Sequence, residues 1–451
     1  MADDSPPRDP EAALARAVEA HRAWVAANPG DPPSRQPVHT VYGGADLFRA
    51  DTARRLGDLA LRSLEAYAPD PSSLAAAVGL EPGFAERIRE RVVAKLEAEP
   101  VEDFRIDFED GFGNRSDDEE NAAAEAAGRE VARGLGEATL PPFVGLRIKP
   151  LTTDLAPRAG RTLEIFLTAL LDTTGGRPPD PLFVTVPKVV VPEQLSALAD
   201  LLDGIEHRAG LPAGAVRMEL MVETPASILG PDGSCPLPAF VAAARGRCAA
   251  AHFGVYDYTA SLGITAFHQD LDHPACDFAR HVMQIALSGS GVWLSDGATN
   301  IMPAPPHRAV EGRGLTAQQE AENRAAVHHG WALHYRHVRH SLRHGYYQGW
   351  DLHPAQLPTR YAAVYAFYLE ALGAATERLS RFVDRAARAT LTGDVFDDAA
   401  TGQALLNFFL RGLGCGAITE EEALATGLTV VELRTRSFLA ILRKRGRDFD
   451  R

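Results

Sequence analysis

Residues 217–223 form the run Arg-Met-Glu-Leu-Met-Val-Glu, and residues 252–257 form the run His-Phe-Gly-Val-Tyr-Asp. Each run is largely apolar and ends on an acid, Glu223 in the first and Asp257 in the second. The two acids stand 34 residues apart, the length of one strand–helix–strand step. Neighbouring parallel strands need a crossover of this kind, usually a helix. The pair therefore predicts two parallel strands whose carboxyl ends each carry an acid.

On both sides of this pair, short β-prone runs alternate with segments of helical periodicity, which is typical of parallel βαβ units. Eight such units close into a barrel, whereas five or six would indicate an open doubly wound sheet. We therefore expect an α/β protein built on a (β/α)8 TIM barrel. The eight runs are 37–42, 104–108, 143–148, 182–186, 217–222, 250–255, 291–295 and 347–352.

Two further regions flank the predicted barrel. Residues 1–36 are expected to form an N-terminal tail and helix, and the catalytic barrel is expected to occupy residues 37–358. The β-prone runs stop there, and residues 359–451 show helical periodicity. This last region is expected to form a C-terminal helical cap over one face of the barrel.

The composition narrows the class of partner. The chain holds 46 Lys and Arg against 60 Asp and Glu, a formal charge of −14, which disfavours nucleic acid and anionic membranes. The N-terminus does not look like a signal peptide, and no apolar stretch approaches the about 18 residues of a membrane span. The four cysteines lack metal-binding spacing. These features predict free thiols in a cytoplasmic protein that binds neither nucleic acid nor membrane.

Glu223 and Asp257 are the predicted metal ligands. Adjacent parallel strands lie about 4.8 Å apart, so both carboxylates can bind one cation. Two carboxylates leave coordination positions for water and a bidentate 2-oxo acid, which suits Mg²⁺, with Mn²⁺ as the alternative. The structural alternative is that Glu223 caps a turn and Asp257 pairs with a basic neighbour. Two such acids on neighbouring strands favour the metal.

Two basic residues also follow predicted strands. Arg147 presents a planar fork, either to a substrate carboxylate or to Glu109 or Asp110 in the acid-rich turn. We favour the substrate contact, in which Arg147 also stabilises a developing oxyanion. Lys188 is either a second anion contact or a structural partner of the acidic turn. Glu109 and Asp110 either bind water on the metal or fix Arg147, and the sequence leaves both roles open.

Histidines complete the candidate site. His39 either contacts substrate or acts as an acid, or it is a buried histidine at a strand end. His353 follows the last β-prone run, in the motif Trp350-Asp-Leu-His-Pro. TIM-barrel active sites occupy the carboxyl ends of the strands. We therefore expect His39 and His353 to lie at the same face as Glu223 and Asp257 and to contact substrate.

These motifs, in this order, resemble the malate synthase / citrate lyase β-subunit superfamily, which includes metal-dependent 2-oxo-acid aldolases. The turn Asp107-Phe-Glu-Asp is similar to the acidic turn of malate synthases. Leu220-Met-Val-Glu-Thr resembles their metal-binding Glu segment, and Gly254-Val-Tyr-Asp-Tyr resembles their metal-binding Asp segment. Arg147 falls where the family keeps its substrate-binding arginine. The resemblance runs through short motifs from about residue 37 to residue 430.

The resemblance extends to the C-terminal region. Val395-Phe-Asp-Asp-Ala-Ala-Thr looks like the C-terminal plug of malate synthases, and Asp398 aligns with the Asp that removes a methyl proton there. An Asp-Asp pair before a helix is also an ordinary N-cap. The segments after the acidic turn and after Arg147 depart from the malate synthase pattern, which counts against a CoA thioester as co-substrate.

The hypothesis that follows is a Mg²⁺-dependent carbon–carbon lyase of the aldolase type, which acts on a small 2-oxo or hydroxy acid through an enolate. Glu223 and Asp257 would hold the metal, and Arg147 and Asp398 would be the catalytic residues. A malate-synthase-like Claisen condensation of an acyl-CoA with glyoxylate is the alternative enzyme. A non-catalytic, metabolite-binding regulatory barrel is the alternative from another class. A homo-oligomer is compatible with all three.

Overall fold

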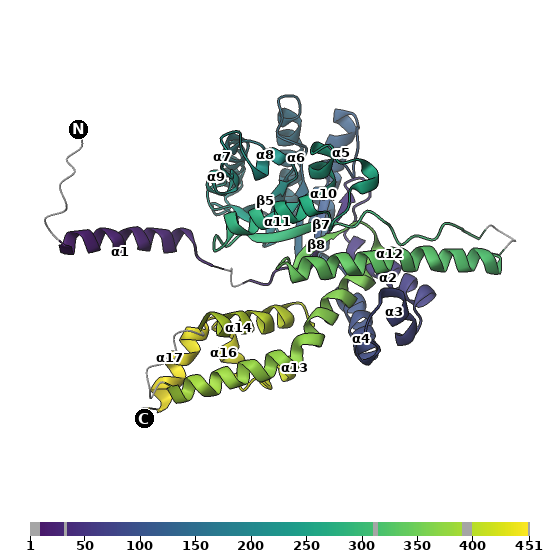
Figure 1. The fold of residues 1–451 in the computed structure, drawn as a ribbon. Coiled ribbons are helices and arrows are strands. Elements are labelled where there is room, and N and C mark those ends of the chain that lie inside the picture. Colours follow the sequence, from purple (N-terminus) through teal and green to yellow (C-terminus); the bar gives the residue numbers. More distant parts are fainter. Residues whose placement is uncertain (1–9, 31–33, 310–313, 390–398, 450–451) are drawn as a thin grey trace.

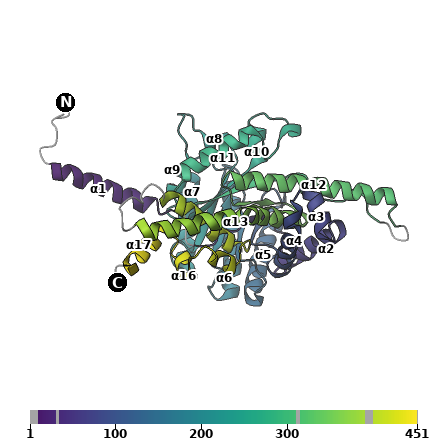
Figure 2. The ribbon, with the colours of Figure 1, turned by 60° about the horizontal axis from the view of Figure 1, so that its bottom comes forward.

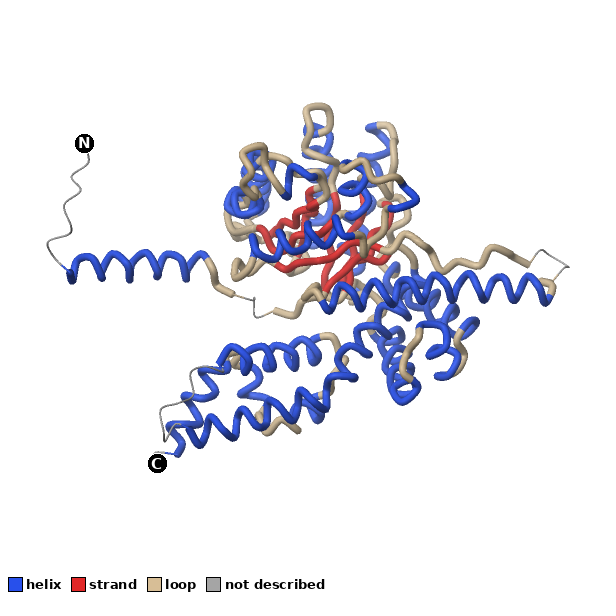
Figure 3. Tube along the Cα trace, in the orientation of Figure 1, coloured by secondary structure: helices blue, strands red, loops and turns tan. Residues whose placement is uncertain are grey.

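The computed structural model describes residues 10–30, 34–309, 314–389 and 399–449. Its centre is a closed barrel in which each strand pairs in parallel with the next (Figures 1 and 3). This arrangement confirms the predicted TIM barrel. The strands are β1 (His39–Gly44), β2 (Asp103–Asp107), β3 (Phe143–Arg147), β4 (Leu182–Val186), β5 (Val216–Val222), β6 (Cys248–Phe253), β7 (Trp293–Ala298) and β8 (Gln348–Asp351).

Helices cover the outside of the barrel and connect each strand to the next. Three helices join β1 to β2, and the remaining connections hold one or two helices each, with a short 3-10 turn before α11. The connecting elements are α2 (Thr52–Tyr67), α3 (Pro71–Val78), α4 (Pro82–Ala98), α5 (Asp117–Glu137), α6 (Ala156–Thr174), α7 (Pro192–Ala209), α8 (Pro225–Ile228), α9 (Leu237–Ala243), α10 (Val255–Ser261), η1 (Ala266–His268), α11 (Pro274–Leu287) and α12 (Ala317–Arg343).

Helix α5 shows how the sequence builds these connections. Ser116 caps its N-terminus, since the Ser116 hydroxyl accepts from the Glu119 backbone N–H and the Glu119 carboxylate accepts from the Ser116 N–H. Such reciprocal capping satisfies two backbone donors that a helix start leaves free. Further along, a Cβ atom at Gly128 would lie 2.5 Å from the Phe166 carbonyl oxygen, so glycine permits the close packing of α5 on α6.

The middle of the barrel is polar and not purely aliphatic. The Arg105 Nε atom donates to Glu219 Oε2 at 2.7 Å, and the guanidinium also pairs with Asp103. Its planar face lies 4.6 Å from the ring centroid of Phe183. The Thr185 hydroxyl donates to the same Glu219 oxygen at 2.7 Å. Buried charges are tolerated when they are paired and hydrogen-bonded in this way.

The C-terminal region is helical, as predicted, and lies at the amino-terminal end of the barrel. Helix α14 lines a cavity of about 400 Å³ together with Gln36, which precedes β1, and Trp293, which opens β7. Figure 1 shows these helices below the barrel, and in Figure 2 helix α13 crosses in front of it. The elements are η2 (Pro354–Gln356), α13 (Leu357–Ala389), α14 (Ala399–Gly414), α15 (Glu420–Leu424), α16 (Val430–Arg434) and α17 (Phe438–Phe449).

The N-terminal helix α1 (Pro10–Ala27) extends away from the barrel in both views (Figures 1 and 2). The predicted helical extension is therefore present. Among the described residues, none of the helices combines the length and apolarity that a membrane crossing requires. All four cysteines are free thiols, as expected.

Candidate active site

The two predicted metal ligands lie at the carboxyl ends of neighbouring strands. Glu223 directly follows β5, and its side chain is buried. Asp257 lies in the first turn of α10, after β6, and its side chain is 46 % exposed. Gly254 lies between β6 and α10, where a Cβ atom would lie 2.5 Å from Glu223 Cβ and 2.8 Å from Glu223 Oε2. Glycine at position 254 therefore makes the room that the Glu223 carboxylate occupies.

Lys188 connects these acids to the acidic turn. Its backbone N–H donates to Glu223 Oε1 at 2.7 Å. Its ammonium group pairs with Glu109 and lies 3.7 Å from Asp257 Oδ2 and 3.9 Å from Asp110 Oδ1. One lysine thus faces carboxylates from the loops after β2, β5 and β6.

The backbone of Lys188 is strained to achieve this arrangement. Its φ angle is 53°, in the left-handed region that residues other than glycine seldom adopt. Such strain costs on the order of 1 kcal/mol and is concentrated at functional sites. The left-handed turn after Pro187 places the Lys188 N–H against Glu223.

Burial and mutual repulsion perturb the carboxylates. Burial, followed by the negative charges of Asp257 and Glu109, raises the pKa of Glu223 to about 8. Burial also raises the pKa of Glu109, against the opposing effect of Arg147 and Lys188. Although burial opposes it, the hydrogen bond to Glu109 and the surrounding carboxylates raise the pKa of Lys188. The cluster therefore carries more negative charge than its own cations neutralise.

These donors fit a hard divalent cation. Mg²⁺ takes one or two carboxylates and keeps several waters, and it is a small cation with oxygen ligands. Glu223 supplies a fixed, buried carboxylate, and the half-exposed Asp257 opens toward solvent. Among the described residues, no three of these carboxylates bring their oxygens within 4.8 Å of one another. The negative charge of Asp257 acts on Glu223, so the two carboxyl groups lie close enough to interact, and water or substrate would complete a site formed by this pair.

Arg147 is the buried cation of the site. Its Nε atom donates to Asp107 Oδ1 at 2.7 Å, and a second nitrogen binds the other Asp107 oxygen. Its Nη1 atom lies 2.9 Å from Glu109 Oε2. The aromatic rings of Tyr42 and Trp350 lie 4.9 Å and 5.4 Å from the guanidinium carbon. In this structure Arg147 therefore holds the acidic turn, the role that the sequence left as an alternative to substrate contact.

His353 lies at the carboxyl end of β8, as expected. It is half-buried, and its Nδ1 atom accepts from the Ala355 backbone N–H at 3.2 Å. Burial lowers its pKa, which keeps the ring neutral. His353 and Tyr42 line a cavity of about 410 Å³ between the ends of β1 and β8 and helix α2. Because the Tyr42 ring also contacts Arg147, this cavity borders the site.

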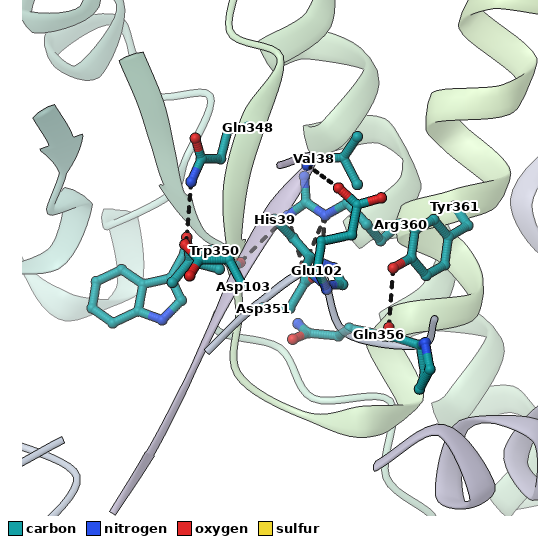
Figure 4. A network of polar contacts seen from close by, with 12 residues as sticks. Val38, His39, Glu102, Asp103, Gln348, Trp350, Asp351, Gln356, Arg360 and Tyr361 are labelled. Carbon is teal, nitrogen blue, oxygen red and sulfur yellow. Dashed lines mark hydrogen bonds and ion pairs between the residues drawn. The ribbon is translucent and has the colours of Figure 1, made fainter. Parts of the chain in front are cut away.

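The predicted position of His39 is wrong. Strand β1 begins at His39 and ends at Gly44, so His39 lies at the amino-terminal end of the barrel, opposite Glu223. The ring is fully buried: Nδ1 lies 2.9 Å from Asp351 Oδ2, and Nε2 accepts from the Glu102 backbone N–H at 3.0 Å (Figure 4). Asp351 also binds His334 and Arg360. His39 thus belongs to a polar network that joins the barrel to α12 and α13.

Asp398 lies outside the described residues. Helix α14, which begins at Ala399, lies at the amino-terminal face, where Arg411 Nη1 donates to Gln36 Oε1 at 3.1 Å. The described part of the helical cap therefore covers the end of the barrel away from Glu223.

Three contributors to the site were missed from the sequence. Asp107 is the main partner of Arg147, whereas the sequence had pointed to Glu109 or Asp110. Tyr42 and Trp350 cover the guanidinium. No local pattern marks these two aromatic residues, because β1 and β8 become neighbours only when the barrel closes.

Comparison with solved structures finds similarity to citrate lyases and malate synthases. A citrate lyase from Burkholderia xenovorans LB400 is 18 % identical with a TM-score of 0.53, over 88 % of this chain and 97 % of that one. A Haloferax volcanii malate synthase is 12 % identical with a TM-score of 0.45, over 91 % and 97 % of the two chains. The citrate lyase β subunit of M. tuberculosis, solved with oxaloacetate and magnesium, is 16 % identical with a TM-score of 0.38, over 74 % and 98 %.

The protein is thus a TIM barrel whose fold is similar to that of the Burkholderia xenovorans citrate lyase, which confirms the resemblance at the level of the fold. In sequence, the chain belongs to the family described as a domain of unknown function, DUF6986, whose model matches residues 17–441. No curated protein matches the chain.

Proposed function

We propose that the protein is a Mg²⁺-dependent carbon–carbon lyase of the aldolase type, acting on a small 2-oxo or hydroxy acid. The observation that carries this proposal is the buried Glu223 carboxylate next to the half-exposed Asp257 at neighbouring strand ends. Bound there, Mg²⁺ or Mn²⁺ would polarise a 2-oxo carbonyl as a Lewis acid, which is worth several kcal/mol.

The remaining residues have distinct roles in this proposal. Glu223 and Asp257 hold the cation, and Gly254 and the Lys188 N–H fix the orientation of Glu223. The Lys188 ammonium, which is one-third exposed, contacts the substrate carboxylate while it holds Glu109. Arg147 contributes positive charge behind the acidic turn and stabilises developing negative charge on the substrate.

Lys188 does not act through a Schiff base in this proposal. Imine formation requires a neutral amine, which enzymes obtain by lowering the lysine pKa. At Lys188, although burial opposes it, the surrounding carboxylates raise the pKa, so the amine stays protonated. An anion contact is the chemistry that a permanent ammonium group supports.

The Claisen alternative is less well supported. It would use Asp398 as the base and an acyl-CoA as co-substrate, and Asp398 lies outside the described residues. The segments after the acidic turn and after Arg147 depart from the malate synthase pattern, so the proposal does not use a CoA thioester. Asp398 stays the proposed base that takes a proton from the nucleophilic partner. Asp110 and His353 remain as polar groups at the correct face for substrate contact.

The proposal is tested by enolate formation and bond cleavage. The purified protein is incubated with Mg²⁺ in D₂O, and deuterium exchange at C3 of pyruvate and cleavage of 4-hydroxy-2-oxo acids are followed by NMR. We expect Mg²⁺-dependent exchange that is lost in Glu223→Gln and kept in Glu193→Gln, an exposed acid on α7. Binding of 2-oxo acids without exchange or turnover would instead support the regulatory barrel.

A further inference from the structure

A second group of metal-binding side chains lies outside the barrel, between the loop that follows α10 and helix α12. It consists of Asp270, Asp272 and His337, which we call the Asp-Asp-His cluster. The His337 Nε2 atom lies 3.0 Å from Asp270 Oδ1 and 3.9 Å from Asp272 Oδ1. One ligand atom from each residue falls within 4.8 Å of the other two. This spacing is compact enough for one ion.

The His337 ring is buried and aimed at the two acids. Only 1 % of the residue is exposed, and its Nδ1 atom lies 3.0 Å from the Thr299 hydroxyl. The opposite nitrogen, Nε2, has no hydrogen-bond partner among the described residues, and it lies 3.0 Å from Asp270 Oδ1. Metal-binding histidines commonly use one ring nitrogen for a polar neighbour and the other for the ion. His337 has this arrangement.

The loop after α10 holds Asp270 and Asp272 close to His337 without a bound ion. Asp270 and Asp272 flank Leu271, which is buried and whose carbonyl oxygen accepts from Arg280. Residues 270–273 form a turn, in which the His273 N–H donates to the Asp270 carbonyl oxygen at 3.2 Å. The buried leucine thus anchors the turn while both carboxylates face His337.

The remaining contacts of the cluster leave room for an ion. Asp270 Oδ1 accepts from the Leu271 N–H at 2.8 Å, and Asp272 Oδ2 lies 3.6 Å from Nε of the exposed Arg336. Both carboxylates are partly exposed, at 41 % and 33 %. Water can therefore complete the coordination from the solvent side.

We propose that Asp270, Asp272 and His337 form a binding site for a divalent transition metal, with Zn²⁺ as the best-suited ion. One imidazole nitrogen and two carboxylate oxygens are the ligands that such ions take from proteins, and water supplies a fourth position. The bound ion fastens the loop after α10 to α12. Since α10 carries Asp257, this second site braces the wall of the candidate active site.

A neighbouring cluster of similar composition provides the control. Asp277, His340 and His344 also bring ligand atoms together. There, however, Asp277 Oδ1 already accepts from Arg280 Nη1 at 2.6 Å and lies 2.8 Å from His340 Nε2, and His344 Nδ1 lies 2.9 Å from the His340 carbonyl. The buried guanidinium of Arg280 already pairs with Asp277 there, so His340→Gln should not affect metal binding.

The test measures Zn²⁺ binding to the full chain by isothermal titration after chelator treatment. All variants are made in the Glu223→Gln protein, which serves as the background. This substitution removes a metal ligand of the candidate active site, so the test is independent of the proposed function. We expect about one Zn²⁺ per chain, bound at least tenfold more weakly after Asp270→Asn plus Asp272→Asn, since even second-shell changes cost 10–100-fold. His340→Gln should bind like the background.

Thermal unfolding gives an independent readout, because a ligand that binds only the folded state raises the unfolding temperature. Zn²⁺ should raise it in the background and in His340→Gln, and not in the double Asp variant. The two Asp side chains are partly exposed, so this variant should fold even if changes at the buried His337 impair folding. Absence of Zn²⁺ binding, or binding that the double Asp variant retains or His340→Gln removes, would overturn the proposal.

Discussion

The backbone N–H of Lys188 donates a 2.7 Å hydrogen bond to the Oε1 atom of Glu223, and so ties the end of β4 to the end of β5. Lys188 adopts a left-handed conformation to make this bond. The same residue sends its ammonium group to Glu109. Backbone and side chain of one residue thus organise acids from two different loops.

Gly254→Ala should damage the site through Glu223. The new methyl group would lie 2.5 Å from Glu223 Cβ and 2.8 Å from Oε2, so the carboxylate must move. We expect Mg²⁺ affinity to fall by at least about tenfold and stability to fall by about 1–3 kcal/mol, as for other overpacked sites. Titration calorimetry and urea unfolding measure the two effects.

The matched control for this variant is Gly136→Ala. Nothing lies within 4 Å of a Cβ atom at Gly136, which is in α5. In a helix this change should stabilise the protein by up to about 1 kcal/mol and leave Mg²⁺ binding unchanged. Equal Mg²⁺ affinities in the two variants would contradict the assigned role of Gly254.

The metal-free protein should become less stable as the pH rises toward 8. Burial and the nearby carboxylates raise the pKa of Glu223 from 4.5 to about 8, so the folded chain binds an extra proton between these values. The stabilisation is complete below pH 4.5 and is lost as the pH rises through about 8. The difference in unfolding free energy between wild type and Glu223→Gln should change in this window by about 1 kcal/mol per pH unit.

Mg²⁺ affinity should rise over the same pH range, since the ligand must lose its proton before it binds. Chemical unfolding with chelator present and calorimetry with Mg²⁺ present measure the two trends. A pH-independent difference between wild type and Glu223→Gln would show that the carboxyl group is already ionised.

Arg147→Lys should lower the free energy of unfolding, although the substitution keeps the positive charge. Lysine cannot reproduce the two-nitrogen contact with Asp107, and the residue is 3 % exposed. We expect a loss of at least about 2 kcal/mol, since a broken buried pair leaves charge uncompensated. The exposed pair of Arg129 and Glu125 supplies the control, where Arg129→Lys should change stability by less than about 0.5 kcal/mol.

Borohydride should not trap Lys188 on a 2-oxo acid. Trapping requires an imine, and the raised pKa of Lys188 keeps its amine protonated. Mass spectrometry after treatment with pyruvate and borohydride should show an unmodified chain. A reduced adduct on Lys188 would replace the metal-based proposal with Schiff-base chemistry.

His39→Gln should affect stability and not catalysis. The ring is buried and contacts Asp351 and the Glu102 N–H at the amino-terminal end of the barrel. Glutamine cannot satisfy both contacts, so we expect a loss of about 1–3 kcal/mol. Kinetics should show unchanged kcat and KM, and a change in kcat alone would restore the predicted role in the site.

The sequence predicted the barrel because the strand signals are local. Apolar β-prone runs and the helices between them define parallel crossovers without any tertiary knowledge, and their number indicates closure. Glu223 and Asp257 lie at strand ends for the same reason. The strand predicted at residues 37–42 lies at His39–Gly44, so His39 is its first residue and lies at the amino-terminal end of the barrel.

The partners of Arg147 and the side of the helical cap could not be read locally. The contacts of Arg147 with Tyr42 and Trp350 join strands that are far apart in sequence. The placement of α14 depends on packing against residues such as Gln36 and Trp293. Neither the aromatic partners of Arg147 nor the placement of α14 can be predicted from residue spacing along the sequence.

The ion pair between Arg105 and Glu219 restricts how the barrel can evolve. Replacing either residue alone leaves an unpaired charge in the interior. Replacing both with apolar side chains of similar volume can leave the stability of the fold unchanged or increase it. Homologues should therefore change these positions together or keep both, and a redesign of the barrel centre should recode Asp103, Arg105, Thr185 and Glu219 as one unit.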